Sequence, residues 1–212
     1  MIFVLCDDPL AYGVATLANQ SMKQGVLPRF VPAIALTAVC WAVFLVNNVL
    51  LNGSLTGYGI VPRHISSLPG ILWSPFLHAS FQHLAANTVP LLILGLIICG
   101  RSKKEFSAAC ASGILIGGGL TWLFARTACH VGASGLVFCF FGYVASLAYF
   151  RRTFGSLLLS VACIVGYGGL LRGVLPTTVA ISWEGHLSGL LAGIAAAWMV
   201  SNTRKTSSLR KP

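Results

Sequence analysis

Six apolar segments separated by polar connections dominate this sequence, and each is close to the length that a helix needs to cross a lipid bilayer. A bilayer core about 30 Å thick requires about 20 apolar helical residues, with a range of about 17–25. Because no water inside a bilayer satisfies exposed backbone groups, such segments fold as helices. The sequence therefore predicts an all-α, polytopic membrane protein. Its six spans are expected at about residues 30–51, 82–99, 106–125, 134–150, 156–174 and 186–201.

The composition supports a membrane protein over a water-soluble one. Hydrophobic residues make up 56% of the 212 positions and charged residues only 8%, whereas a soluble domain carries about 25% charged residues. A chain this poor in charge cannot cover a water-exposed surface. The length suits one compact domain. We predict an N-terminal cytoplasmic segment over 1–29, a six-helix domain over 30–201 and a basic cytoplasmic tail over 202–212.

The positions of Lys and Arg predict the orientation in the membrane. The net charge of +10 is compatible with nucleic acid binding, but the basic residues lie between the apolar segments, as topology signals do, so no nucleic-acid partner is expected. If the N-terminus is cytoplasmic, eleven of the 14 Lys and Arg residues lie on the inside. We therefore predict that both termini are cytoplasmic. The three basic residues expected outside are Arg63, Arg126 and Arg172.

Polar side chains inside the apolar segments are costly, and by default they indicate a functional site. His83 and Asn87 lie four residues apart on one helical face of the second segment. Ser134 lies in the first turn of the fourth segment, and His186 in the first turn of the sixth. These three segments all run from outside to inside in the predicted topology. We therefore expect the four side chains to share one depth near the outer face and to converge.

Small residues predict a close contact between the fourth and sixth segments. His186, Gly189 and Gly193 share one helical face, and small residues at such spacing let two membrane helices approach closely. The matching face of the fourth segment carries Ser134 and Gly142. A close crossing would bring the serine hydroxyl within hydrogen-bond reach of the imidazole. That is the minimum requirement for a serine nucleophile with a histidine general base.

Hydrogen-bond donors for a developing oxyanion are also available. The candidates are the backbone N–H of Ser134 and the side chains of His83 and Asn87. No carboxylate is expected to orient His186, since the neighbouring Glu184 is expected to face the outer aqueous surface. The sequence therefore predicts a Ser–His dyad and not a triad.

The remaining histidines and the cysteines have simpler interpretations. His64, His78 and His130 are expected to be loop or interface residues. No metal site is predicted, because the histidine spacing fits no metal-binding motif and acidic ligands are lacking. The seven cysteines include no CxxC pair and are expected to be free thiols.

Three motifs in order along the chain resemble the rhomboid intramembrane serine proteases: HxxxN at His83–Asn87, GxSG at Gly132–Gly135 and GHxxG at Gly185–Gly189. The stretch LPGILWSPFLHASFQHLAANTVPLLILG also resembles the bacterial members around the first loop and second helix. The resemblance covers about residues 60–200. Two features differ from the family pattern: Phe138 stands where many bacterial members have Tyr, and the first outer loop lacks the Trp-Arg pair of some members.

The resemblance implies a six-helix bundle in a bacterial cytoplasmic membrane. It implies an intramembrane serine endopeptidase that cleaves transmembrane or membrane-anchored proteins near the outer face of the bilayer, at small residues with helix-destabilising residues nearby. Ser134 would be the nucleophile and His186 the general base and acid. The Ser134 amide, His83 and Asn87 would form the oxyanion hole. The resemblance implies no metal or cofactor, and as partners only transmembrane protein substrates and the lipid bilayer.

Two other functions remain open. A non-catalytic member of the same family would bind client transmembrane helices without cleaving them. Such members tend to lose the serine or the histidine, and both are present here. A small transporter would carry polar residues along a path through the bilayer, whereas here they gather at one end of the spans.

Overall fold

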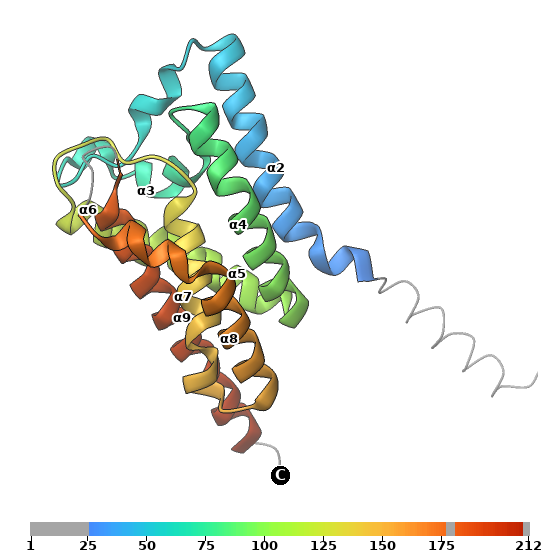
Figure 1. The fold of residues 1–212 in the computed structure, drawn as a ribbon. Helices are drawn as coiled ribbons and strands as arrows, with labels where there is room; N and C mark the ends of the chain where they lie inside the picture. The colour runs from blue at the N-terminus through green and yellow to red at the C-terminus, as the bar shows by residue number, and fades with distance from the viewer. Residues whose placement is uncertain (1–25, 177–180, 210–212) are drawn as a thin grey trace, which may run out of the picture.

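A computed structural model describes residues 26–176 and 181–209 of this protein. Over those residues the fold is a bundle of long helices with a loop region gathered at one end (Figure 1). The helices α4, α7 and α9 all begin at that end, which we call the upper end after its place in Figure 1. The predicted segments 1–29 and 202–212 lie partly outside the described residues, so the domain boundaries stay a prediction.

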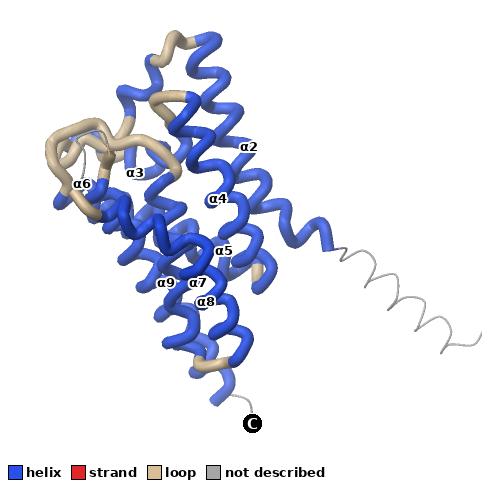
Figure 2. Tube along the Cα trace, viewed as in Figure 1, coloured by secondary structure: helices blue, strands red, loops and turns tan. Residues whose placement is uncertain are grey.

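The described helices follow the predicted apolar segments in order, and every regular element in Figure 2 is helical. Their bounds are α2 (Val26–Leu50), α4 (Phe81–Arg101), α5 (Lys103–Ala111), α6 (Gly118–Phe124), α7 (Ser134–Arg151), α8 (Phe154–Tyr167) and α9 (Trp183–Leu209). A π-helical segment, η4 (Ser112–Gly117), joins α5 to α6. A 3-10 segment, η5 (Gly168–Val174), continues from α8. The all-α prediction is therefore confirmed for the described chain.

Five of the six predicted spans fall on helical stretches that are long and apolar enough to cross a membrane. Within the described residues these stretches are Pro28–Leu50, Phe81–Arg101, Lys103–Phe124, Ser134–Arg151 and Phe154–Val174. The sixth predicted span, 186–201, lies in α9, which is not among them. Glycine, serine and histidine on this helix lower its mean hydropathy, and a helix face that packs against protein does not need to be apolar.

The connection between α2 and α4 folds into short helices at the upper end. These are η1 (Ser54–Tyr58), η2 (Ile65–Ser67), α3 (Gly70–Trp73) and η3 (Ser74–Phe76). An isolated antiparallel bridge pairs Ile60 with His130. The Arg63 guanidinium donates hydrogen bonds to the carbonyl oxygens of Leu123 and Ala125, at 3.2 and 2.8 Å. The first connection is therefore tied to the end of α6 and to the segment that leads into α7.

Helix α7 lies in the core of the bundle, while α8 lies at its surface. The largest buried side chains of α7 include Phe140, Tyr143 and Leu147, and the helix packs against α4, α8, α9 and η4. Helix α8 exposes apolar side chains such as Leu158 and Val165. In a bilayer this exposed face would contact lipid, since exposed apolar residues on a spanning helix need no protein partner.

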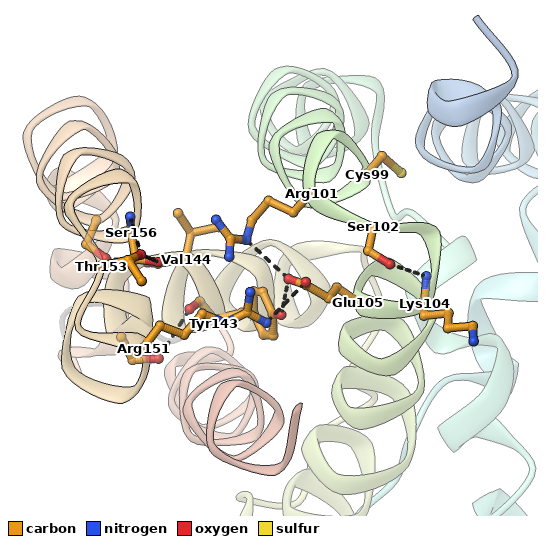
Figure 3. Close-up of polar contacts among 12 residues, drawn as sticks. Cys99, Arg101, Ser102, Lys104, Glu105, Tyr143, Val144, Arg151, Thr153 and Ser156 are labelled. Atoms are coloured by element: carbon orange, nitrogen blue, oxygen red, sulfur yellow. Dashed lines mark hydrogen bonds and ion pairs between the residues drawn. The ribbon is translucent and has the colours of Figure 1, made fainter. Parts of the chain in front are cut away.

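A buried polar cluster joins α4, α5 and α7 at the end of α7 opposite to Ser134 (Figure 3). The Glu105 side chain at its centre is only 2% exposed. Its carboxylate accepts a hydrogen bond from the Tyr143 hydroxyl at 2.7 Å and forms ion pairs with Arg151 at 3.1 Å and Arg101 at 3.2 Å. Because Glu105 and its partners come from three helices, the cluster holds these helix ends together.

The main chains of α7 and α9 are in direct contact where they cross. A Cβ atom added to Gly189 would overlap the carbonyl oxygen of Gly135, and one added to Gly193 would overlap a carbonyl oxygen of α7. On α7, a Cβ atom added to Gly142 would lie 2.5 Å from the Leu190 carbonyl oxygen. The close crossing predicted from the small residues is therefore present, with glycines on both helices.

The substitution Gly193→Ala is expected to destabilise the fold, because the added methyl group has no space against the α7 main chain. Overpacking of this kind costs about 1–3 kcal/mol. Thermal unfolding in detergent micelles measures the effect. Gly166→Ala on α8 is a matched control, since nothing lies within 4 Å of a Cβ atom there, and its effect should stay below about 0.5 kcal/mol. Equal melting temperatures for the two variants would contradict the close crossing.

Candidate active site

Ser134 is the first residue of α7. Backbone N–H groups in the first turn of a helix have no partner within the helix. Two residues earlier, Gly132 has a φ angle of +118°, a backbone conformation that favours glycine. The chain therefore turns sharply into α7, and the predicted position of Ser134 in the first helical turn is confirmed.

Two hydrogen bonds hold the main chain directly before Ser134. The Gly132 N–H donates to the carbonyl oxygen of Ser74 at 2.9 Å, and the Ala133 N–H donates to Nε2 of His78 at 3.3 Å. Burial lowers the pKa of His78 to about 4, so its ring is neutral at pH 7 and Nε2 can accept. His78 is a loop residue, as predicted, but the sequence pattern did not indicate its contact with the segment before α7.

His83 and Asn87 face the same segment from the first turns of α4. A Cβ atom on Gly132 would lie 2.6 Å from His83 Nε2 and 3.6 Å from Asn87 Nδ2. Nδ2 of Asn87 is buried and has no hydrogen-bond partner within the described part of the chain. A buried donor without a partner costs free energy. Asn87 therefore offers a free donor next to Gly132, which lies two residues before Ser134.

His186 lies in the first turn of α9, and two contacts orient its ring. The ring stacks on Phe138, with centroids 4.2 Å apart and an interplanar angle of 11°. Nδ1 of His186 lies 2.8 Å from the carbonyl oxygen of Gly173. Because a carbonyl oxygen can only accept, Nδ1 carries the proton, and Nε2 of the neutral ring is left as an acceptor. The ring is therefore held on one face by Phe138 and at Nδ1 by the Gly173 carbonyl oxygen.

The Ser134 and His186 side chains lie on facing turns of the two crossing helices. A Cβ atom on Gly135 would lie 3.7 Å from the Gly185 carbonyl oxygen, and Phe138, which stacks on His186, is one turn after Ser134. Among the described residues, the Ser134 hydroxyl has no hydrogen-bond partner. Catalytic hydrogen bonds are often long before substrate binds, and the predicted dyad stays a prediction.

A second set of hydrogen bonds, through His130 and Ser182, joins the segment before α7 to the start of α9. Nδ1 of His130 lies 2.6 Å from the Ser182 hydroxyl, and Nε2 of His130 lies 3.0 Å from the Arg126 carbonyl oxygen. The Ser182 hydroxyl also accepts from the Gly185 N–H at 3.2 Å. These bonds hold the turn that carries His186. The sequence signal for His130 is its place two residues before Gly132 of the GxSG motif, which by itself does not indicate a partner.

Glu184 is buried, so its predicted position at an aqueous surface is wrong. It is 9% exposed and forms an ion pair with the Arg126 side chain at 3.7 Å. The partner reduces the free-energy cost of burying the carboxylate. Within the described chain, no hydrogen bond or ion pair joins Glu184 to His186. The prediction that no carboxylate orients the histidine is therefore unaffected.

A small cavity of about 50 Å³ opens beside Ser134. Its walls come from α3, η4, α6, the segment before α7 and the start of α9. They include Ile71, Gly117, Thr121, Ser182 and Gly185. A cavity of this size accommodates a few water molecules, since each needs about 10–15 Å³ of such space.

Two comparisons with known proteins bear on this chain. The family model described as Rhomboid domain matches residues 66–203. An uncharacterized protein of Mycobacterium tuberculosis is 34% identical over 211 residues, which cover 92% of this chain and 86% of the relative. An uncharacterized protein of Mycobacterium leprae is 32% identical over 220 residues, which cover 99% of this chain and 86% of the relative.

Proposed function

Because this chain belongs to the rhomboid family, we propose that it is an intramembrane serine endopeptidase that cleaves transmembrane or membrane-anchored proteins. The family also contains members without activity, so the chemistry of the site must carry the proposal. The observation that carries it is the orientation of His186. Its ring is held by Phe138 and Gly173 at the turn that faces Ser134, with Nε2 as the acceptor.

The proposed reaction begins when the Ser134 hydroxyl attacks the scissile carbonyl carbon. Its proton passes to Nε2 of His186, and a bond forms between the serine oxygen and the carbon. When the tetrahedral intermediate collapses, the carbon–nitrogen bond breaks and Nε2 returns the proton to the leaving amine. Water then attacks the acyl-enzyme, with His186 as the base, and the serine hydroxyl is regenerated.

The oxyanion of the intermediate would be bound by donors on α4 and α7. The free donor of Asn87 supports this role, because a buried N–H group without a partner gains a hydrogen bond only when an acceptor arrives. The other proposed donors are the Ser134 amide and His83, which lies beside the main chain of Gly132. Preorganised donors of this kind lower the barrier because they need no reorganisation during the reaction.

The cavity beside Ser134 would receive a side chain next to the cleaved bond, and its small volume is compatible with the proposed preference for small residues. We further propose that the upper end of the bundle faces the outside of a bacterial cytoplasmic membrane, with both termini in the cytoplasm. In that orientation water reaches the site from the outer face. Helix α9 would be the sixth span, shielded on one side by α7.

A fluorophosphonate probe is expected to label Ser134 in the protein purified in detergent, because such probes phosphorylate activated serine hydroxyls. Peptide mass spectrometry would locate the label. His186→Ala should reduce labelling by at least about tenfold, since the general base is then missing. A label on another serine, or equal labelling of the His186→Ala variant, would contradict the dyad and favour a non-catalytic protein that binds client helices.

A further inference from the structure

We propose that the main-chain carbonyl of Gly173 is a positioning group for His186, in the place that a carboxylate takes in a Ser–His–Asp triad. The inference rests on the proposed function, because positioning matters only if His186 acts as the general base. It assigns a role to η5, the 3-10 segment that continues from α8. None of the sequence motifs includes this segment.

The His186 ring is held on one face and at one edge. Phe138 covers a face of the ring, and the Gly173 carbonyl oxygen accepts the Nδ1 proton at 2.8 Å. Stacking alone leaves the ring free to flip by half a turn about its Cβ–Cγ bond, which would exchange the places of nitrogen and carbon atoms. The hydrogen bond removes that freedom and selects the tautomer whose Nε2 accepts a proton.

The close approach of this carbonyl requires glycine at position 173. A Cβ atom there would lie 2.8 Å from Cζ of Phe138 and 3.0 Å from Nδ1 of His186. Both distances are shorter than an ordinary van der Waals contact. A side chain at this position would therefore push the carbonyl away from the imidazole or displace the ring from Phe138. By contrast, nothing lies within 4 Å of a Cβ atom on Gly169 in the same segment.

A carbonyl suits this position for an electrostatic reason. When Nε2 takes the serine proton, the ring becomes an imidazolium, and the Nδ1–H bond to the carbonyl becomes charge-assisted and stronger. A carboxylate would stabilise the same cation, but as a buried ion it would also have to be stripped of water. The carbonyl dipole supplies part of the stabilisation without an added buried charge.

The tautomer of His186 tests the contact without any need for turnover. The chain has five histidines, so ¹⁵N-histidine labelling gives few ring signals, and His186→Asn identifies the one that disappears. At a pH where the ring is neutral, we expect the proton on Nδ1 in the wild-type protein. Gly173→Ala should move the population toward the Nε2–H form, whereas Gly169→Ala should leave it unchanged. A wild-type ring with its proton on Nε2 would overturn the proposal.

Kinetics test the consequence for the reaction. In liposomes with a labelled transmembrane substrate, Gly173→Ala should lower kcat by at least about tenfold, because the general base is then misaligned. KM should change by less than about threefold, since η5 contributes no proposed substrate contact. Gly169→Ala should match the wild type. A folded Gly173→Ala variant that keeps the Nδ1–H form and wild-type kcat would also overturn the proposal.

The two readouts separate this inference from the proposed function. A wild-type protein that shows the Nδ1–H form but no Ser134-dependent cleavage would contradict the proposed function and still support the contact with Gly173. If Gly173→Ala does not fold, the tautomer of His186 in the wild-type protein still tests the proposal. The Nδ1–H form supports it, and the Nε2–H form overturns it.

Discussion

Replacing Ser134 with alanine is expected to reduce cleavage of a transmembrane substrate by at least about 10³-fold, because the reaction then lacks its nucleophile. The protein reconstituted in liposomes with a fluorescently labelled substrate provides the measurement. Little residual rate is expected, since a bilayer also excludes water from most of the substrate. The fold should be unaffected, because the Ser134 hydroxyl makes no hydrogen bond with any of the described residues.

The chain offers a matched control on the same helix. The Ser146 hydroxyl donates to the Gly142 carbonyl oxygen of its own helix at 2.7 Å, and Ser146→Ala should retain full activity. His186→Ala should lose about as much activity as Ser134→Ala. The double variant should lose no more than either single variant, because residues that act as one unit are not additive.

The outcomes of this series separate the candidate functions. Equal cleavage by the wild type and the Ser134→Ala variant would exclude the proposed mechanism. A wild type that cleaves nothing, but is crosslinked to transmembrane helices equally well with or without Ser134, would favour the non-catalytic client-binding protein.

Replacing Glu105 with alanine is expected to lower the stability by about 3–5 kcal/mol, which is the usual cost of removing one partner from a buried ion pair. Arg151, whose side chain is 9% exposed, would lose its ion-pair partner Glu105, and the Tyr143 hydroxyl would lose its acceptor. Urea or thermal unfolding in micelles provides the measurement. Glu105→Gln should have an intermediate effect, because it keeps an acceptor for Tyr143 but not the charge.

The neighbouring Lys104 gives the control for this prediction. Its side chain is exposed, and Lys104→Ala should change the stability by less than about 0.5 kcal/mol. If Glu105→Ala and Lys104→Ala unfold at the same denaturant concentration, the cluster in Figure 3 does not hold the helix ends together.

Most of the fold and part of the candidate site could be predicted from the sequence. The apolar segments located five of the helical stretches to within a few residues, because the free energy of moving a side chain from water to lipid is a property of that side chain. The sixth segment lies in α9, which runs beyond its predicted end to Leu209. Glycines spaced along one helical face predicted the close crossing of α7 and α9, because the small size of glycine is likewise a property of the residue itself. The motifs around Ser134 and His186 resembled a family to which the chain belongs.

Other features could not be predicted, because they depend on partners that are distant in sequence. Glu184 is buried because Arg126, on another connection, lies next to it. His78 and His130 looked like ordinary loop residues until their contacts with Ala133 and Ser182 were known. In each case the type of residue did not indicate which group it would meet.

The sequence by itself therefore determined that this chain is a helical membrane protein of the rhomboid type, and which side chains could carry its chemistry. Only the tertiary structure decided how His186 is oriented, and the reason is physical. The acceptor for its Nδ1 proton is the main-chain carbonyl of Gly173. Every residue has such a carbonyl, so its role depends on where the chain places it. The glycine that its close approach requires is one of 23 in the sequence, and its residue type does not indicate the contact.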